Sequence, residues 1–242
     1  MIKESEFLIR VCKEAAGLIT DDFALSVKGG RGDLVTDFDF KVEKFIIDEI
    51  KKEYPTFEII SEEYNPTVKL TENCFVIDPI DGTINFAYGI PLWGIQTACI
   101  KNGKTVASVI YLPKLNELYH ADDEGAFCNG QKIHVSNTAF DKCLYTLSVR
   151  KCGADWEEPP MPIKNFKHLR KIGASSVSAA WVACGRFCGF LIKDYDTPWD
   201  YVPGHFLIEQ AGGFIHDEPA CHAAANSKEF LDALIKEAKT GL

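Results

Sequence analysis

The spacing of hydrophobic residues along the chain changes twice. Two stripes at helical spacing come first, and they predict amphipathic helices over 5–19 and from about residue 38 to 53. Short apolar runs separated by the tight turns Asn102-Gly103 and Asn129-Gly130 follow, as in an antiparallel meander. The first stripe comprises Phe7, Leu8, Val11, Ala15, Leu18 and Ile19, and the second comprises Phe38, Val42, Phe45, Ile46 and Ile50.

Helical and extended patterns alternate in the last third. We expect strands at 143–149 and 187–192, helices at 173–185 and 199–210, two further short strands, and a final helix capped by Ser227. The pattern predicts an α/β (α+β) protein with an α+β half at 1–137 and an α/β half at 138–242. A proline-rich stretch near residues 156–162 is expected to be an irregular connector inside the second half.

Composition excludes several classes of protein. The chain has 242 residues, 46% of them hydrophobic, and no apolar run approaches the roughly 20 residues of a membrane span. A net charge of −9 disfavours binding to nucleic acid or to an anionic membrane. The N-terminal segment lacks the apolar core of a signal peptide, so a cytoplasmic location is expected. Nine cysteines without a CxxC pair indicate free, mostly buried thiols.

The first candidate for a functional site is the segment Asp78-Pro79-Ile80-Asp81-Gly82-Thr83. An apolar run that reads as a buried strand ends on Asp78, Pro79 is expected to stop the strand, and Asp81 and Gly82 turn the backbone. Two carboxylates this close raise each other's pKa unless a cation lies between them. Carboxylates, the Ile80 carbonyl and the N–H groups of a helix starting near Thr83 suit Mg²⁺ and a phosphate. The alternative is a turn with two capping aspartates.

Other acids also stand at the ends or starts of predicted elements. A short apolar strand ends on Glu62 and Glu63, one of which is expected to face the site and the other solvent. Asp200 begins a predicted helix beside Trp199. Lys28 lies next to a glycine-rich loop that lacks the spacing of a P-loop. It either reaches a metal-bound phosphate or water, or is a solvated lysine of the loop.

Four segments in this order resemble the inositol monophosphatase family. They are DLVTDFD (33–39), SEE (61–63), DPIDGT (78–83), and WDYVPG followed by AGG (199–204 and 211–213). The resemblance implies a layered αβαβα sandwich of the sugar-phosphatase type. It also implies a metal-dependent, lithium-sensitive phosphomonoesterase, commonly a homodimer.

The resemblance assigns roles to particular residues. Glu62, Asp78 and the Ile80 carbonyl would hold one Mg²⁺; Asp78, Asp81 and Asp200 would hold a second; and a third, weaker ion would lie near Glu62. Mn²⁺ is a possible substitute, and Li⁺ or Ca²⁺ would inhibit. Glu62, Thr83 and Asp39 would orient and deprotonate the attacking water. The expected substrate contacts are Asp81, Gly82, Thr83, Ala174, Ser175, Lys193 and Asp200.

One position departs from the family pattern. A Glu that contacts inositol usually stands seven residues before the counterpart of Asp200, where this chain has Lys193, or Ile192 if one residue is inserted. Asp194 or Asp196 can substitute for it, Lys193 can meet a second phosphate or carboxylate of the ligand, or Lys193 simply faces solvent.

The expected function is Mg²⁺-dependent hydrolysis of inositol monophosphate or a related small polyol or sugar phosphate. Fructose 1,6-bisphosphate, a 3′-phosphonucleotide, NADP and histidinol phosphate are alternative substrates. A non-catalytic regulatory protein is the alternative from another class.

Overall fold

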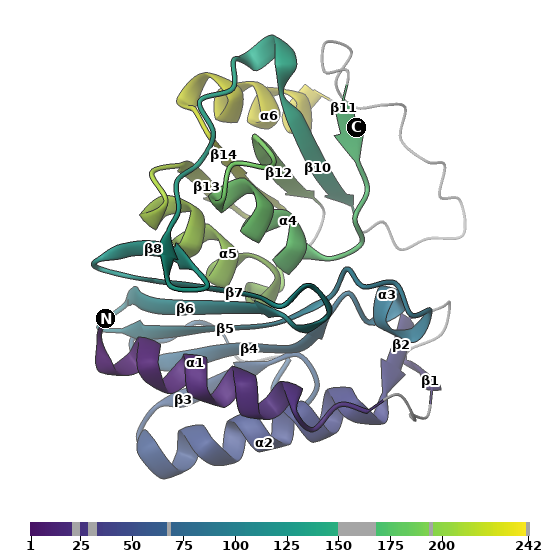
Figure 1. Cartoon of the computed structure of the whole chain (residues 1–242), viewed down its shortest axis with the longest axis vertical. Helices are drawn as coiled ribbons and strands as arrows, with labels where there is room; N and C mark the ends of the chain where they lie inside the picture. The colour runs from purple at the N-terminus through teal and green to yellow at the C-terminus, as the bar shows by residue number, and fades with distance from the viewer. Residues whose placement is uncertain (21–24, 29–32, 67–68, 150–167, 194–195, 241–242) are drawn as a thin grey trace.

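The computed structural model describes residues 1–20, 25–28, 33–66, 69–149, 168–193 and 196–240. Helices and sheets alternate in five layers (Figure 1). Helices α1 (Lys3–Ala16) and α2 (Asp37–Glu53) cover the outer face of a seven-stranded sheet. Helices α4 (Ser175–Ala183) and α5 (Pro198–Gln210) lie between this sheet and a five-stranded one, which α6 (Lys228–Thr240) covers on its far side. The expected layered sandwich is confirmed.

The seven-stranded sheet holds its strands in chain order. Only its first pair, β3 with β4, is parallel; the other neighbours are antiparallel. The β5–β6 hairpin turns on Asn102 and Gly103, both at positive φ as the sequence of the turn predicts. The strands are β3 (Glu58–Ser61), β4 (Cys74–Asp81), β5 (Gly94–Lys101), β6 (Lys104–Leu112), β7 (Glu117–Asp122), β8 (Gly125–Cys128) and β9 (Gln131–Lys132).

The five-stranded sheet has the order β11-β10-β12-β14-β13. Its strands are β10 (Leu144–Val149), β11 (His168–Arg170), β12 (Gly189–Lys193), β13 (Phe214–Glu218) and β14 (Cys221–Ala225). The boundary that we propose at residues 137/138 lies between β9 and a short 3₁₀ turn at Phe140–Lys142. Trp199 and Val202 of α5 pack against Ile60, Val76 and Ala98 of the first sheet, so the two halves share a core.

Several sequence predictions need correction. Helix α1 ends at Ala16, before Gly17, rather than at residue 19. A short antiparallel hairpin, β1 (Leu25–Lys28) with β2 (Asp33–Thr36), precedes α2 and was not expected. Pro79 does not end its strand: β4 shifts register after Asp78 and pairs again at Asp81. The connector near 156–162 lies outside the described residues.

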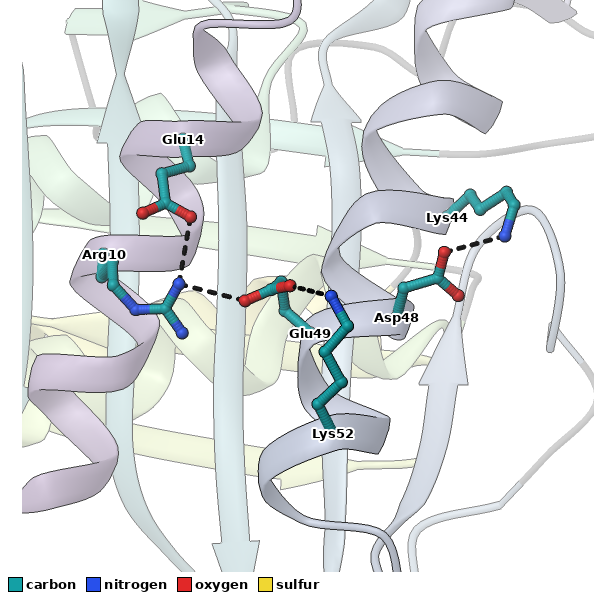
Figure 2. A network of polar contacts seen from close by, with 6 residues as sticks. All are labelled: Arg10, Glu14, Lys44, Asp48, Glu49 and Lys52. Carbon is teal, nitrogen blue, oxygen red and sulfur yellow. Dashed lines mark hydrogen bonds and ion pairs between the residues drawn. The ribbon is translucent and has the colours of Figure 1, made fainter.

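Ion pairs, as well as apolar contacts in the core, link helices α1 and α2. Arg10 of α1 donates to Glu14 and, across the helix pair, to Glu49 of α2, each at 3.0 Å; Lys52 lies 2.6 Å from Glu49 (Figure 2). Arg10, Glu14 and Lys52 are exposed and Glu49 is half-buried, so the ion pairs contribute little next to the apolar contacts beneath them.

Candidate metal centre

Two neighbouring strands bring the first acids together. Strands β3 and β4 run parallel with Ser61 opposite Ile77, so the next residues, Glu62 after the end of β3 and Asp78 within β4, lie side by side. Glu62 lies close enough for its charge to raise the pKa of Asp78. Carboxylate oxygens of Asp78, Asp81 and Asp200 all lie within 4.8 Å of one another. Residues predicted from separate segments therefore share one site.

Asp78 is the most confined of these acids. It is 2% exposed, and its Oδ1 atom has no hydrogen-bond partner among the described residues. Its Oδ2 atom is 3.5 Å from the amide nitrogen of Gln96 on the adjacent strand. Burial, followed by the charges of Glu62, Asp81 and Asp200, raises the pKa of Asp78 well above its ordinary value. A buried carboxylate oxygen without a partner is costly unless a cation meets it.

The N-terminus of α4 holds Asp81. The Ser175 N–H and hydroxyl donate to its Oδ1 atom at 3.0 Å each. The Ser176 N–H donates to its Oδ2 atom at 2.7 Å, and the Ser176 hydroxyl donates to the same atom. Burial nevertheless raises the pKa of Asp81, against the lowering effect of these bonds. The Ser175 N–H, expected to face a phosphate, here faces Asp81.

Gly82 lets two helix starts approach each other. It is the N-cap of α3 (Thr83–Ala87) at φ +86°, and a Cβ atom there would lie 2.9 Å from the Cβ of Ala174, the N-cap of α4. Asn85 strengthens the junction, because its amide donates to the carbonyls of Leu92 and Ile172 at 2.7 and 2.8 Å. Gly82, Thr83, Ala174 and Ser175 therefore lie together beside the acids.

Asp39 approaches the same place from the first turn of α2. Its Oδ2 atom accepts from the Thr36 N–H at 2.7 Å and from the Thr36 hydroxyl at 2.5 Å, an N-terminal capping arrangement. The Thr83 hydroxyl lies 3.3 Å from Asp39 Oδ1 and 2.9 Å from the Ile80 carbonyl oxygen. Burial raises the pKa of Asp39 to about 6.

Asp200 stands in the first turn of α5, as predicted, and its carboxylate accepts from the hydroxyl of the N-cap residue Thr197. Lys193 ends β12 and is half-buried. Asp196 accepts from the Ala220 N–H at 2.5 Å and lies 3.0 Å from His222 Nε2. It is therefore turned toward the β13–β14 hairpin. Asp194 lies outside the described residues.

Two residues that hold the acids in place were missed from the sequence. One is Gln96, in the predicted meander: its amide nitrogen is 2.9 Å from Ser175 Oγ and 3.5 Å from Asp78 Oδ2. Its polar side chain inside an apolar run was an available signal. The other is Ser176, which donates to Asp81 and carries no such signal, because serine at a helix start is common.

The donor set fits a hard divalent cation. The three acids offer carboxylate oxygens as ligands, one of these oxygens is buried without a partner in the part of the chain that the structure describes, and the charges of the acids repel one another. A layered α/β protein with an acidic cluster beside two helix starts fits the class of metal-dependent phosphatases. Comparison with known proteins then gives the family.

The chain belongs to the inositol monophosphatase family, whose sequence profile matches residues 4–239. It is therefore a hydrolase of the phosphatase class in a metal-dependent family. A fructose-1,6-bisphosphatase/inositol-1-monophosphatase from Thermotoga maritima is 35% identical over 208 residues, or 84% of this chain and 79% of the relative. The Nus factor SuhB of Escherichia coli is 31% identical over 227 residues, or 88% and 85% of the two chains.

Solved structures agree with this assignment. The Thermotoga maritima IMPase superimposes with a TM-score of 0.81 at 27% identity, over 98% of each chain. The SuhB protein of Bartonella henselae gives a TM-score of 0.83 at 27% identity, also over 98% of each chain. Among the described residues, no helix has both the length and the apolar composition to cross a membrane.

Proposed function

We propose that the protein is a Mg²⁺-dependent phosphomonoesterase acting on inositol monophosphate or a related small polyol or sugar phosphate. The observation that carries the proposal is the convergence of Asp78, Asp81 and Asp200, with one Asp78 oxygen buried and unpartnered. A protein without catalysis has no reason to keep mutually repelling acids in one cluster. This argues against a purely regulatory role.

Glu62, Asp78, Asp81, Asp200 and the Ile80 carbonyl are the residues that would hold two or three ions. When bound, Mg²⁺ offsets the carboxylate charges and polarises the phosphoryl group. Mn²⁺ is expected to substitute for Mg²⁺, and Li⁺ or Ca²⁺ to inhibit. The chain itself contributes the arrangement: Ser175 and Ser176 fix both oxygens of Asp81, and Gln96 ties Asp78 to the start of α4.

Asp39 and Thr83, with Glu62, are proposed to orient the attacking water and accept its proton. The Thr83 hydroxyl has a single hydrogen, which can be directed to the Ile80 carbonyl or to Asp39. A carboxylate whose pKa is raised to about 6 is suited to accept a proton near neutral pH. Gly82 and Ala174, at the two neighbouring helix starts, are proposed as contacts of the phosphate.

A bisphosphorylated sugar such as fructose 1,6-bisphosphate is the second candidate substrate. Lys193 stands where a carboxylate usually meets inositol, and Asp196 is turned toward Ala220 and His222. A cationic side chain at this position favours a ligand with a second anionic group. On the family resemblance we also propose a cytoplasmic homodimer, which light scattering on the purified protein tests for its oligomeric state.

Phosphate release tests the proposal. The purified protein is assayed with inositol 1-phosphate, fructose 1,6-bisphosphate, a 3′-phosphonucleotide, NADP and histidinol phosphate, in Mg²⁺ and in EDTA. We expect Mg²⁺-dependent release that Asp78→Asn abolishes. Turnover that persists in EDTA would overturn the metal assignment, and inositol 1-phosphate turned over far better than every bisphosphate would overturn the role of Lys193.

A further inference from the structure

A second buried acid on α2 lies behind the site. Glu43 follows Asp39 by four residues, so both project from the same face of the helix, and both are 0% exposed. Asp39 contacts Thr83 within the centre, whereas Glu43 belongs to none of the motifs. A fully buried glutamate is rare unless it is paired.

The partners of Glu43 are backbone groups of the turn that follows β3. Its Oε2 atom accepts from the Glu63 N–H at 2.8 Å, and its Oε1 atom accepts from the Tyr64 N–H at 2.7 Å. The Ser61 hydroxyl also bonds to this carboxylate. Asn65 closes the turn by donating to Ser61 Oγ at 3.1 Å. The contacts of Glu43 thus fall on both sides of Glu62.

Only a carboxylate suits these contacts fully. Two consecutive backbone N–H groups each need an acceptor, and a carboxylate offers an acceptor at both ends. A glutamine of nearly the same shape would turn an NH₂ group toward one of the two donors. A buried N–H left without an acceptor is unfavourable, so the turn would be expected to shift.

We propose that Glu43 is a positioning residue that holds the Ser61–Asn65 turn so that the Glu62 carboxylate faces Asp78 and completes the cation site. The proposal rests on the proposed function of Glu62. Glu43 touches neither substrate nor ion in this account. It acts only through the backbone of the turn.

The test compares E43Q with the matched control E4Q. Glu4 is also a buried acid, 8% exposed, but it lies on α1 and pairs with Lys101 at 3.0 Å, outside the centre. Two quantities are measured: the Mg²⁺ concentration that gives half-maximal phosphate release, and Mn²⁺ affinity by calorimetry without substrate. We expect E43Q to weaken both by about tenfold or more, as mutations behind metal ligands do, and E4Q to change neither.

A double mutant separates positioning from general destabilisation. In an E62Q background, E43Q is expected to cause little further loss of Mn²⁺ affinity, because its effect passes through Glu62. The proposal would be overturned if E43Q bound Mn²⁺ as tightly as the wild type. It would also be overturned if E43Q caused the same loss of Mn²⁺ affinity with and without the Glu62 carboxylate.

Two milder variants decide the matter if E43Q does not fold. S61A removes one donor to Glu43, and E43D keeps a carboxylate; both are expected to weaken Mn²⁺ binding, by less than tenfold, at unchanged stoichiometry. Full affinity in both would refute the role of Glu43. If the wild type binds Mn²⁺ but releases no phosphate from any substrate, the proposed function fails while this inference is still tested by affinity.

Discussion

Replacing Asp78 with asparagine is expected to stabilise the metal-free protein, although it should abolish activity. Asp78 is buried and surrounded by other acids, and its pKa is raised. At an effective dielectric constant of about 20, two charges 4.8 Å apart repel by roughly 3 kcal/mol, and more than one such pair is present. Asparagine keeps the shape of the side chain and removes its charge.

The size of the effect has an upper limit. A carboxylate whose ordinary pKa is about 4 can lower the free energy of unfolding at pH 7 by at most about 4 kcal/mol. If keeping its charge in the folded protein would cost more than this, the group takes up a proton and becomes neutral. We therefore expect a gain of about 1–4 kcal/mol. For a chain of this length, each kcal/mol raises the melting temperature by roughly 2–4 °C.

The pH dependence has a definite sign. At Asp78 the folded protein binds more protons than the unfolded chain between about pH 4 and the raised pKa of this group. The stability of the metal-free wild type, in the part due to Asp78, therefore rises as the pH falls through this window. The Asp78→Asn variant lacks this contribution and should show a flatter profile.

Scanning calorimetry in EDTA and in saturating Mg²⁺ provides the assay. In EDTA the variant should melt above the wild type. In Mg²⁺ the wild type should gain about 3 kcal/mol at one hundred times its Kd, and the variant much less, so that the difference shrinks or reverses. A variant that melts below the wild type in EDTA, or gains equally from Mg²⁺, would refute the reasoning.

Three further predictions concern other parts of the chain. Gly82→Ala should lower stability by clearly more than Gly89→Ala, since both have positive φ but only the first Cβ would collide with a neighbouring helix start; equal losses by thermal melting would contradict this. The pKa of His222 is raised by hydrogen bonds to two aspartates despite its burial. Its contribution to stability should be present below the ordinary pKa of about 6.5 and be lost as pH rises through the raised value, a dependence that His222→Gln should abolish in melting curves. Arg10→Gln should cost less than about 1 kcal/mol by urea unfolding, because its pairing with Glu49 is exposed; a loss of several kcal/mol would be inconsistent with this.

Much of the centre could be predicted because its ligands stand at the ends of regular elements. An apolar run that is followed by acids, as at Asp78 and Asp81, or an acid in the first turn of a helix, as at Asp200, is visible in the sequence pattern. The hairpin at Asn102-Gly103 was predictable for a similar reason, since its turn requires positive φ at both positions.

The supporting residues could not be predicted in this way. Glu43 resembles any glutamate in a helix until α2 is packed against the turn after β3, and Gln96 gains its role only when β5 lies beside β4 and α4. The register shift after Asp78 depends on pairing with β5, which Pro79 alone does not reveal. Long-range packing, rather than local preference, decides these features.

A crystal structure of the protein grown with Mn²⁺ tests the central claim most directly. Anomalous scattering locates Mn²⁺ independently of how the side chains are built. The account predicts anomalous peaks in contact with the carboxylates of Asp78, Asp81 and Asp200, with at least one within coordination distance of the buried Oδ1 atom of Asp78. Well-ordered carboxylates with no anomalous peak between them, at saturating Mn²⁺, would contradict it.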